Sequence, residues 1–464
     1  MAERFDMVVI GSGPAGEKAA AQAAYFGHRV AVVEQAPRPG GAAVSSAGIP
    51  TKTLRETALY LTGFRRRDVY GLQLHLDPEA TLARLRSRTA EVVETMTVAV
   101  ERNLERHGIE LVRGHGRIGP DRTVVVERAG QPPLTLAADV IMLATGSRPF
   151  HPPAVPFDDP DVHDSQTLLG IDHPFGSAVV LGRGIVGCEY ASIMTALGVE
   201  VTLVGGGRLV EFVDAELSGL LAASFERMGM RLLLGRGRPT VSRDAGGLRV
   251  ELPDGTVVRG DKVLSAAGRV GATEDLGLEA AGVRVDQRGR VLVDAAYRTG
   301  VPGVYAAGDV IGPPTLASAA MEQGRVAACH AFAIPFKETV DPLAPYGVYS
   351  IPEVAMVGLT EEAAAATGVD YEVGRGWFAD NARATIAGAR DGLVKLVFRA
   401  DDRRLLGVHV LGDTAAELVH VGQMVLHQGG GMDHFIHTTF NVPTQSEAYK
   451  YAAYDGLQRL AARA

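Results

Sequence analysis

The sequence predicts an α/β fold in which two similar domains with parallel sheets precede a C-terminal α+β domain. The paired domains are indicated by an internal repeat with a constant offset of 171 residues and no gap. The last domain is indicated by a change of pattern from about residue 346, where short alternating strands replace the βα repeats. A chain of 464 residues has the length of about three domains.

The repeat begins with an apolar run followed by spaced glycines. Residues 8–16 (VVIGSGPAG) align with residues 179–187 (VVLGRGIVG), and each stretch predicts a strand that turns into an Ala-rich helix. A second apolar strand follows at 30–33 and at 201–204. Glycines at this spacing allow a tight turn, close approach of a diphosphate and close packing of helix on strand. One such motif is a weak signal, but two in register predict two Rossmann-like dinucleotide-binding domains. The candidate phosphate-binding residues are Gly11, Gly13, Pro14, Ala15 and Gly16 in the first copy and Gly182, Gly184, Ile185, Val186 and Gly187 in the second.

The two copies differ at the position after the second strand, which is Glu34 in the first and Gly205 in the second. A carboxylate there can accept hydrogen bonds from the hydroxyls of an adenosine ribose, which suits FAD or NAD. It would repel a ribose 2′-phosphate by on the order of 1 to 4 kcal/mol per charge pair. Gly205 removes that barrier, and Arg208 lies close enough in sequence to offer a cation. We therefore expect the second site to accept both NAD and NADP. The alternative is a flexible turn over 205–207 with Arg208 as a solvated charge.

Charge and hydropathy favour a large enzyme without nucleic-acid or membrane partners. The formal net charge of −8 is modest, and the basic run at 65–67 is more typical of a solvated patch than of a phosphate groove. The few residues before the first strand leave no room for a signal peptide. No apolar run has the length needed to cross a bilayer, so we expect a cytoplasmic protein.

Neither the cysteines nor the histidines predict a metal site. Cys188 and Cys329 fall in different predicted domains and outside any C-x-x-C pattern. Packing is the simpler interpretation of Cys188, although a thiol in the first turn of a helix can be reactive. His420, His427 and His434 recur every seven residues, which an amphipathic helix or an oligomer interface explains without a metal.

Small and Pro-rich segments mark the expected domain boundaries. A strand over 139–143 is followed by the Pro-rich crossing at 151–156, which we interpret as the exit from the first domain. The second domain ends in another strand with small residues, at 265–269. After it, 303–310 has the pattern of a buried strand that brings Asp309 to a turn. Further elements are expected at 317–331 (a helix) and at 393–398 and 407–411 (strands).

Several longer motifs carry a resemblance to a known family. They are IPTKTLR (49–55), GSRP (146–149), YAAGDVIG (305–312), QGR (323–325), YSIPEV (349–354) and FNVPT (440–444). In these residues the chain resembles the two-dinucleotide-binding flavoprotein disulfide reductases, the group of dihydrolipoamide dehydrogenase and glutathione reductase. Within that group it is most similar to the soluble, Si-specific NAD(P) transhydrogenases.

The resemblance implies three domains and two nucleotide sites. Residues 1–150 and 271–340 would bind FAD, 151–270 would bind NAD(P), and 341–464 would form a dimerisation domain of a homodimer or larger homo-oligomer. Further FAD-binding candidates are Glu34, Gly41, Lys52, Thr145, Gly146, Gly308, Asp309 and Ala317, and further NAD(P)-binding candidates are Gly205, Arg208 and Gly268. A carboxylate beside a diphosphate would be repelled, so Asp309 suits a ribityl hydroxyl better.

The departures from the family pattern concern the disulfide chemistry. Members carry two cysteines just before the Ile-Pro-Ser/Thr-Lys run, and here those positions hold Ala43 and Gly48. The His before the Pro of the C-terminal motif is replaced by Val442, while Glu447 remains where its partner carboxylate would stand. Because both thiols and the base are missing, electrons cannot leave through a dithiol.

What remains is machinery for hydride transfer. By resemblance, Lys52 stands beside the reactive edge of the flavin and Glu189 pairs with it; a fixed ammonium there would stabilise charge on the reduced ring. From spacing alone, Lys52 is an ordinary helix-start residue and Glu189 a first-turn acid favoured by the helix dipole. We expect a ping-pong enzyme that transfers hydride between NADPH and NAD through FAD and one nicotinamide site. The alternatives are an FAD-dependent NAD(P)H oxidase or quinone reductase, and a non-catalytic FAD-binding subunit.

Overall fold

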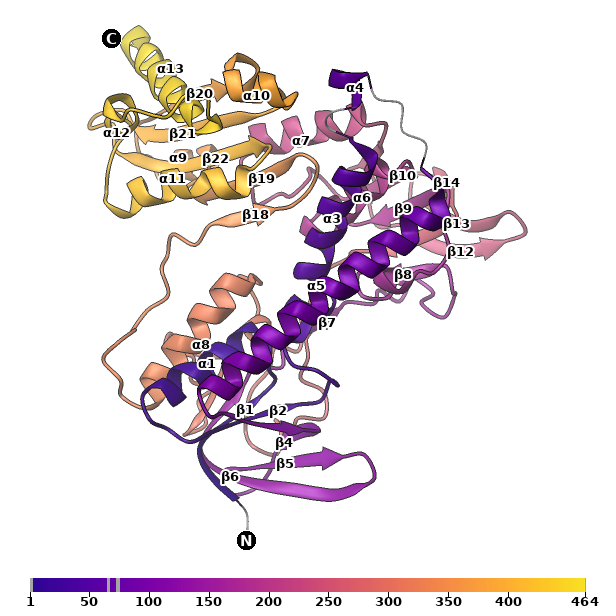
Figure 1. The fold of residues 1–464 in the computed structure, drawn as a ribbon, viewed down its shortest axis with the longest axis vertical. Coiled ribbons are helices and arrows are strands. Elements are labelled where there is room, and N and C mark those ends of the chain that lie inside the picture. The colour runs from indigo at the N-terminus through magenta and orange to yellow at the C-terminus, as the bar shows by residue number, and fades with distance from the viewer. Residues whose placement is uncertain (1–2, 65–66, 72–75, 464) are drawn as a thin grey trace. The chain divides into compact units, whose positions relative to one another are not determined.

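A computed structural model describes residues 3–64, 67–71 and 76–463 of the chain (Figure 1). The described residues form two compact units. The first unit comprises Met1–Thr53, Arg86–Phe150 and Gly268–Asp341, and the second comprises Leu54–Leu85, His151–Ala267 and Pro342–Ala464. Arg65 and Arg66 of the basic run lie outside the described residues.

The first unit is built on a seven-stranded sheet of order β3-β2-β1-β6-β5-β4, in which β17 also pairs with β6. Strands β1, β2, β3, β6 and β17 pair in parallel, and β4 and β5 continue the sheet antiparallel. The strands are β1 (Glu3–Ile10), β2 (Val30–Glu34), β3 (Glu110–Arg113), β4 (His115–Ile118), β5 (Thr123–Arg128), β6 (Gln131–Leu143) and β17 (Val304–Ala306). The expected strand over 139–143 is thus the end of a longer one, because an antiparallel hairpin with β5 extends it at its start.

Helices cover this sheet, and their packing depends on small residues. The helices are α1 (Pro14–Tyr25), α2 (Gly41–Ser45), α8 (Ala317–Ala331) and, from Arg86 onward, the long α5 (Pro78–Arg106). Helix α3 (Ile49–Thr62) belongs to this unit only as far as Thr53. Helices α1 and α8 lie side by side (Figure 1). A Cβ atom at Gly324 of α8 would lie 2.2 Å from the carbonyl oxygen of Ala15, so the contact requires glycine. Side chains of β1 alternate between two apolar clusters, with Met7 and Val9 on the helical face and Val8 and Ile10 on the other.

The second unit holds a five-stranded parallel sheet of order β11-β10-β9-β15-β8. Its strands are β8 (Val162–Asp164), β9 (Ser177–Leu181), β10 (Glu200–Gly205), β11 (Arg231–Leu234) and β15 (Lys262–Ser265), with helices α6 (Ile185–Ala196) and α7 (Ala215–Arg227). The repeat is preserved in the structure with its offset of 171 residues. The ends of β1 and β9, the starts of α1 and α6, and the ends of β2 and β10 are each separated by this number of residues. The fold class, including both Rossmann-like sheets, is therefore confirmed.

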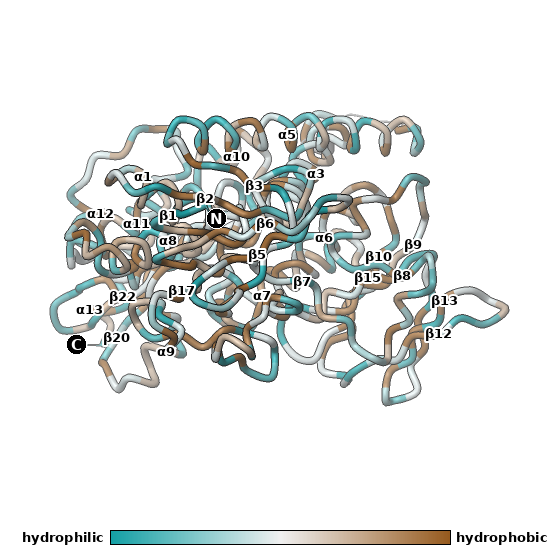
Figure 2. The backbone as a smooth tube through the Cα atoms, turned by 90° about the horizontal axis from the view of Figure 1, so that it is seen from below, coloured by the Kyte–Doolittle hydropathy of each residue, from teal (hydrophilic) through white to brown (hydrophobic). Residues whose placement is uncertain are grey.

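A second, antiparallel sheet in this unit has the order β18-β19-β22-β21-β20. Its strands are β18 (Tyr346–Val348), β19 (Glu353–Gly358), β20 (Tyr371–Trp377), β21 (Leu393–Arg399) and β22 (Leu405–Gly412). Helices α11 (Ala415–His427) and α13 (Ala448–Arg463) share one apolar cluster with the sheet, and the Tyr449 hydroxyl donates to the Leu418 carbonyl at 2.7 Å. In Figure 2 hydrophobic colouring is clear near β2, β5 and β6 of the first unit.

The remaining elements are short. They are β7 (Ser147–Pro149), β12 (Thr240–Asp244), β13 (Gly247–Glu251), β14 (Val257–Gly260), β16 (Arg269–Gly271), α4 (Arg67–Tyr70), α9 (Glu361–Ala366), α10 (Ala382–Ala387), α12 (Asp433–His437), η1 (Thr167–Gly170), η2 (Asp309–Ile311), η3 (Phe378–Asp380) and η4 (Gln445–Glu447). Among the described residues, no helix is long and apolar enough to span a membrane.

Candidate functional site

The first glycine motif forms a backbone cradle between β1 and α1. Gly11 has φ +103°, and a Cβ there would lie 2.4 Å from the Ala144 carbonyl oxygen. Gly13 caps α1 and has no side chain to accept from the first-turn N–H groups, which leaves these donors for an anion. Gly41 closes the cradle, because its Cβ would lie 2.7 Å from the Cα of Gly13. Pro14, Ala15 and Gly16 form the first turn of α1.

Glu34 lies buried at the end of β2 and is fixed by this cradle. Its Oε2 accepts from the backbone N (3.0 Å) and the hydroxyl (2.5 Å) of Ser12, and its Oε1 accepts from the Ala36 N at 2.7 Å. The Ser12 hydroxyl in turn accepts from the Gly40 N at 3.1 Å. A carboxylate oxygen has two lone pairs, so Oε1 can accept from a ribose hydroxyl as well.

Asp309 lies beyond β17 in a second polar cluster of the first unit. Its Oδ2 accepts from the Ser147 hydroxyl at 2.8 Å, and the same hydroxyl accepts from Arg269 Nε at 2.7 Å. Arg269 Nε is 3.9 Å from Asp309 Oδ2, so the negative charge of Asp309 has a cation nearby. Gly308 precedes Asp309 with φ +82°, and its N–H donates to Gln323 at 2.9 Å.

The other predicted residues of the first unit also have defined contacts. The Thr145 hydroxyl donates to the Ala272 carbonyl at 2.7 Å, and the Gly146 carbonyl accepts from the Ala272 N at 3.0 Å. Ala317 is the first residue of α8. Gly268, which was predicted to bind NAD(P), lies in the first unit, where its carbonyl accepts from the Phe150 N at 2.9 Å. The motif glycines, Glu34 and Asp309 therefore offer anion donors and ribose and ribityl acceptors within one unit, which fits FAD.

The positions of the missing redox cysteines are close in space. A Cβ at Gly48 would lie 2.9 Å from the carbonyl oxygen and 3.4 Å from the Cα of Ala43, yet neither residue carries sulfur. Cys188 and Cys329 are both free and buried. Val442, at the position of the family base, is 63 % exposed. The chain thus has no cysteine pair for disulfide chemistry.

The second glycine motif repeats the cradle in the second unit. Gly182 has φ +139°, and a Cβ there would lie 2.3 Å from the Ala266 carbonyl oxygen. Gly11 has the same close approach to the Ala144 carbonyl in the first copy. Gly184 caps α6, whose first turn contains Ile185, Val186 and Gly187. These residues also fit a dinucleotide diphosphate.

Gly205 ends β10 beneath the side chain of Arg183, the residue between the first two glycines of the motif. A Cβ at Gly205 would lie 2.7 Å from Arg183 Cβ and 3.1 Å from its Cδ. The Arg183 guanidinium donates to the Arg208 carbonyl at 2.9 Å and to Glu211 Oε2 at 2.5 Å. The sequence analysis did not single out Arg183. The available signal was that the second copy of the repeat has an arginine between its first two glycines and a glycine, not an acid, at the end of its second strand.

Arg208 itself points into its own loop. Its NH2 donates to the carbonyl oxygens of Glu211 (2.7 Å) and Val213 (3.1 Å), and its NH1 is 3.5 Å from Glu362 Oε1. Arg208 is therefore neither a simple solvated charge nor the cation nearest to Gly205. Its assignment to a 2′-phosphate stays a prediction.

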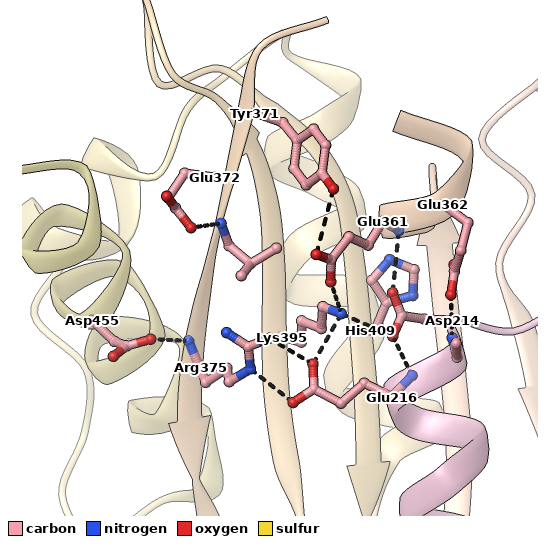
Figure 3. A network of polar contacts seen from close by, with 12 residues as sticks. Asp214, Glu216, Glu361, Glu362, Tyr371, Glu372, Arg375, Lys395, His409 and Asp455 are labelled. Carbon is pink, nitrogen blue, oxygen red and sulfur yellow. Dashed lines mark hydrogen bonds and ion pairs between the residues drawn. The ribbon is translucent and has the colours of Figure 1, made fainter. Parts of the chain in front are cut away.

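The loop after β10 ends in a buried ionic network (Figure 3). Asp214 caps α7 by accepting from the Glu216 N, and its other oxygen accepts from the Glu361 N, both at 3.1 Å. Lys395 Nζ, whose side chain is 1 % exposed, lies 2.9 Å from Asp214, 3.0 Å from Glu216 and 2.5 Å from Glu361. Arg375 contacts both oxygens of Glu216 at 2.7 and 2.8 Å. The network fixes the start of α7 to the C-terminal sheet.

Burial and ion pairing act in opposite directions on this network. Burial would lower the pKa of Lys395, but hydrogen bonds to Glu361 and Asp214 outweigh it and the pKa lies above its ordinary value. Burial would likewise raise the pKa of Asp214, but the nearby imidazole of His409 and the hydrogen bonds from Lys395 and the Glu361 N together hold this pKa below its usual value. Both groups are therefore charged at neutral pH.

The two predicted catalytic residues belong to different units. Lys52 lies in α3, where its Nζ is 3.4 Å from the Thr51 hydroxyl. Glu189 is buried in α6, and its Oε1 accepts from the Tyr349 N at 2.9 Å. Their pairing stays a prediction. Within residues 3–64, 67–71 and 76–463, no group of three or more His, Cys, Asp or Glu side chains could hold a metal ion.

Comparisons with known proteins agree with this arrangement. Residues 5–324 match the family described as pyridine nucleotide-disulphide oxidoreductase, and residues 344–453 match the dimerisation domain of that family. The chain belongs to the pyridine nucleotide-disulphide oxidoreductase family, and it is thus a flavoprotein oxidoreductase that acts on pyridine nucleotides.

Relatives that cover nearly the whole chain are named for one activity. A soluble pyridine nucleotide transhydrogenase of Mycobacterium bovis (strain BCG / Pasteur) is 41 % identical over 460 residues, covering 99 % of this chain and 98 % of the relative. One of Marinomonas sp. (strain MWYL1) is 37 % identical over 460 residues, covering 98 % and 99 %.

Solved structures match the fold over the same length. LpdA from Mycobacterium tuberculosis superimposes with a TM-score of 0.88 at 28 % identity, covering 97 % of this chain and 99 % of that chain. The HOCl-induced flavoprotein disulfide reductase RclA from Escherichia coli gives 0.87 at 26 % identity with the same coverage.

Proposed function

We propose that this protein is an FAD-dependent transhydrogenase, which transfers hydride between NADPH and NAD by a ping-pong reaction at one nicotinamide site. The observation that carries the proposal is the contrast between the two cradles. The first ends at the carboxylate of Glu34, whereas the second ends at Gly205 beneath a guanidinium. The name of the relatives at 37–41 % identity supports the same activity.

In this proposal FAD and NAD(P) bind to different domains. Residues 1–150 and 271–340 bind FAD, with the diphosphate at the first cradle, the adenosine ribose at Glu34 and the ribityl chain at Asp309. Residues 151–270 bind NAD(P) at the second cradle. When bound, FAD supplies the ring that accepts and returns hydride. The protein contributes position and charge.

Lys52 and Glu189 would serve the hydride step. With FAD bound, an ammonium at Lys52 would stabilise negative charge on the flavin ring, and Glu189 is the proposed partner carboxylate. Hydride transfer needs no separate base, which is consistent with Val442 at the position of the family histidine. The sulfur-free positions 43 and 48 exclude a dithiol at this place as the electron acceptor.

We further propose that residues 341–464 join two subunits into a homodimer. The match of residues 344–453 to a dimerisation domain supports this assignment. Exposed Tyr451 and Tyr454 on α13 and Met424 on α11 offer apolar contact area in this region.

An anaerobic half-reaction titration tests the proposed activity. The FAD-loaded protein is mixed with NADPH and, separately, with NADH, while the flavin absorbance is followed from milliseconds to seconds. We expect both coenzymes to bleach the flavin, and thio-NAD to restore its colour after NADPH. A protein that NADPH bleaches but that only oxygen or a quinone restores would be an oxidase or quinone reductase. Flavin that neither coenzyme bleaches would contradict any enzymatic function.

A further inference from the structure

We propose that Arg183 is the residue that recognises the 2′-phosphate of NADP, and that Glu211 is a built-in competitor that holds its guanidinium when this phosphate is absent. This inference rests on the proposed nucleotide site at the second cradle. It extends that proposal by naming the side chains that set the balance between NAD and NADP.

The internal repeat supplies the first argument. Ser12 and Arg183 occupy the same position of the two motifs, and so do Glu34 and Gly205. In the first copy the hydroxyl of Ser12 donates to the carboxylate of Glu34. In the second copy the side chain of Arg183 lies over Gly205 instead. The repeat has therefore replaced a negative group by a positive one at the place where such folds bind the 2′ position of the ribose.

The position of the guanidinium supplies the second argument. Arg183 Cζ and Nε would lie 3.6 and 3.7 Å from a Cβ at Gly207, so the head group stands over the strand end rather than out in solvent. Its side chain is 25 % exposed, which leaves a ligand access to it. Guanidinium groups match phosphate oxygens with paired N–H donors, and Arg183 can turn such a pair toward a phosphate.

The loop that surrounds Arg183 is held in a defined shape. Val210 has φ +43°, a left-handed conformation that is unfavourable for a β-branched residue, and it is buried. Its N–H donates to the Arg183 carbonyl at 2.8 Å. The Arg208 guanidinium holds two further carbonyls of the loop. Strain of this kind persists only where the surroundings fix it, so the loop is preorganised around Arg183.

Glu211 occupies the place that an anionic ligand would take on Arg183. Its carboxylate contacts the Arg183 NH2 at 2.5 Å and its side chain is 65 % exposed, so it can swing away into solvent. A bound 2′-phosphate must displace this carboxylate, whereas a ribose 2′-hydroxyl need not. Glu211 therefore weakens NADP binding and leaves NAD binding unchanged. It thus reduces the difference in affinity between the two coenzymes, and a transhydrogenase needs both to bind at one site.

Fragment binding to the FAD-loaded protein tests the inference. Isothermal titration with adenosine 2′,5′-bisphosphate and with 5′-AMP gives two dissociation constants whose ratio reports recognition of the 2′-phosphate alone. For Arg183→Met we expect the bisphosphate to bind about 10- to 100-fold more weakly and 5′-AMP to bind as before. For Glu211→Gln we expect the bisphosphate to bind about 3- to 10-fold more tightly. Arg236→Met, an exposed arginine paired with Asp254, is the matched control and should change neither constant.

The variants separate the possible results. Retained 5′-AMP binding shows that Arg183→Met is folded, and a gain of affinity in Glu211→Gln cannot arise from misfolding. The inference would be overturned if Arg183→Met left the ratio of the two dissociation constants unchanged. It would also be overturned if the preference for the bisphosphate disappeared in Arg208→Met but not in Arg183→Met. Because neither fragment carries a nicotinamide, the titration does not depend on hydride transfer. Failure of the transhydrogenase activity would leave this result intact.

Discussion

Replacement of Lys395 by Met tests the network that fixes the loop after β10. The change preserves the length of the side chain but removes the cation between Asp214, Glu216 and Glu361, whose oxygens lie 2.5 to 3.0 Å from Nζ. Removing one partner of a buried ion pair costs about 3 to 5 kcal/mol, because the remaining charges are left desolvated and unpaired. Arg375 contacts only Glu216 among these carboxylates, so it cannot replace the lost charge at Asp214.

Amide hydrogen exchange is the suitable assay, because a chain of two compact units need not unfold in one step. The loss of about 3 to 5 kcal/mol corresponds to a decrease of roughly 100- to 4,000-fold in the protection of α7 and β21 against exchange. The decrease cannot exceed the protection that the stability of the whole unit provides. Peptides from β1 and α1 in the first unit serve as internal reference. Lys337→Met is the matched control, since its partly exposed pair with Glu322 should contribute less than about 1 kcal/mol.

The effect of Lys395→Met should depend on pH with a defined sign. The pKa values of Asp214 and Glu216 lie below their ordinary values. Burial would raise both, but the imidazole of His409 and hydrogen bonds from Lys395 and the backbone lower the first, and hydrogen bonds from Arg375 and Lys395 lower the second. Their stabilisation is thus present above the ordinary carboxyl pKa of about 4 and is lost as the pH falls through the lower folded values. Without Lys395 these carboxylates protonate more readily, so the difference from the unmodified protein should shrink toward pH 4. Unchanged protection in the variant at pH 7 would refute this account of the network.

Three further predictions concern the nucleotide sites and the buried thiol. Lys52→Ala should keep its FAD but be reduced by NADPH about 100-fold more slowly in stopped-flow measurements; a full rate would remove Lys52 from the proposed reaction. Gly205→Glu should weaken NADPH binding by about 1 to 4 kcal/mol, because it brings a carboxylate to the strand end and its Cβ would collide with Arg183; unchanged NADPH affinity in a titration would contradict the proposed pocket. Burial raises the pKa of the Cys188 thiol to about 12, so iodoacetamide at pH 8 should label it only after unfolding; rapid labelling of the folded protein, detected by mass spectrometry, would show that this thiol is accessible.

The parts of the fold that depend on local patterns could be predicted from the sequence. The constant offset of the repeat predicted both βαβ units, because apolar strands and glycines with positive φ specify their turn locally. The helix expected over 317–331 coincides with α8. The network around Lys395 could not be predicted, since its members are scattered from residue 214 to residue 395 and only the folded chain brings them together.

The candidate site shows the same limit. Proximity in sequence suggested Arg208 as the cation for Gly205, but the side chain that covers Gly205 is Arg183, 22 positions earlier. The direction of both guanidinium groups depends on the loop that Val210 and Arg208 shape, which no local pattern indicates. In the polar cluster of the first unit, Ser147 likewise lies 122 residues from Arg269 and 162 residues from Asp309 in the sequence.

The contact between Gly324 and Ala15 has a consequence for how the protein tolerates change. A single methyl group at Gly324 would need the space of a main-chain oxygen 2.2 Å away, so α1 and α8 would have to separate. Helix α1 begins at the first cradle and α8 follows the turn that carries Asp309. In a library of random variants, substitutions at this glycine should therefore yield pale colonies or apoprotein, although the residue lies outside both nucleotide motifs.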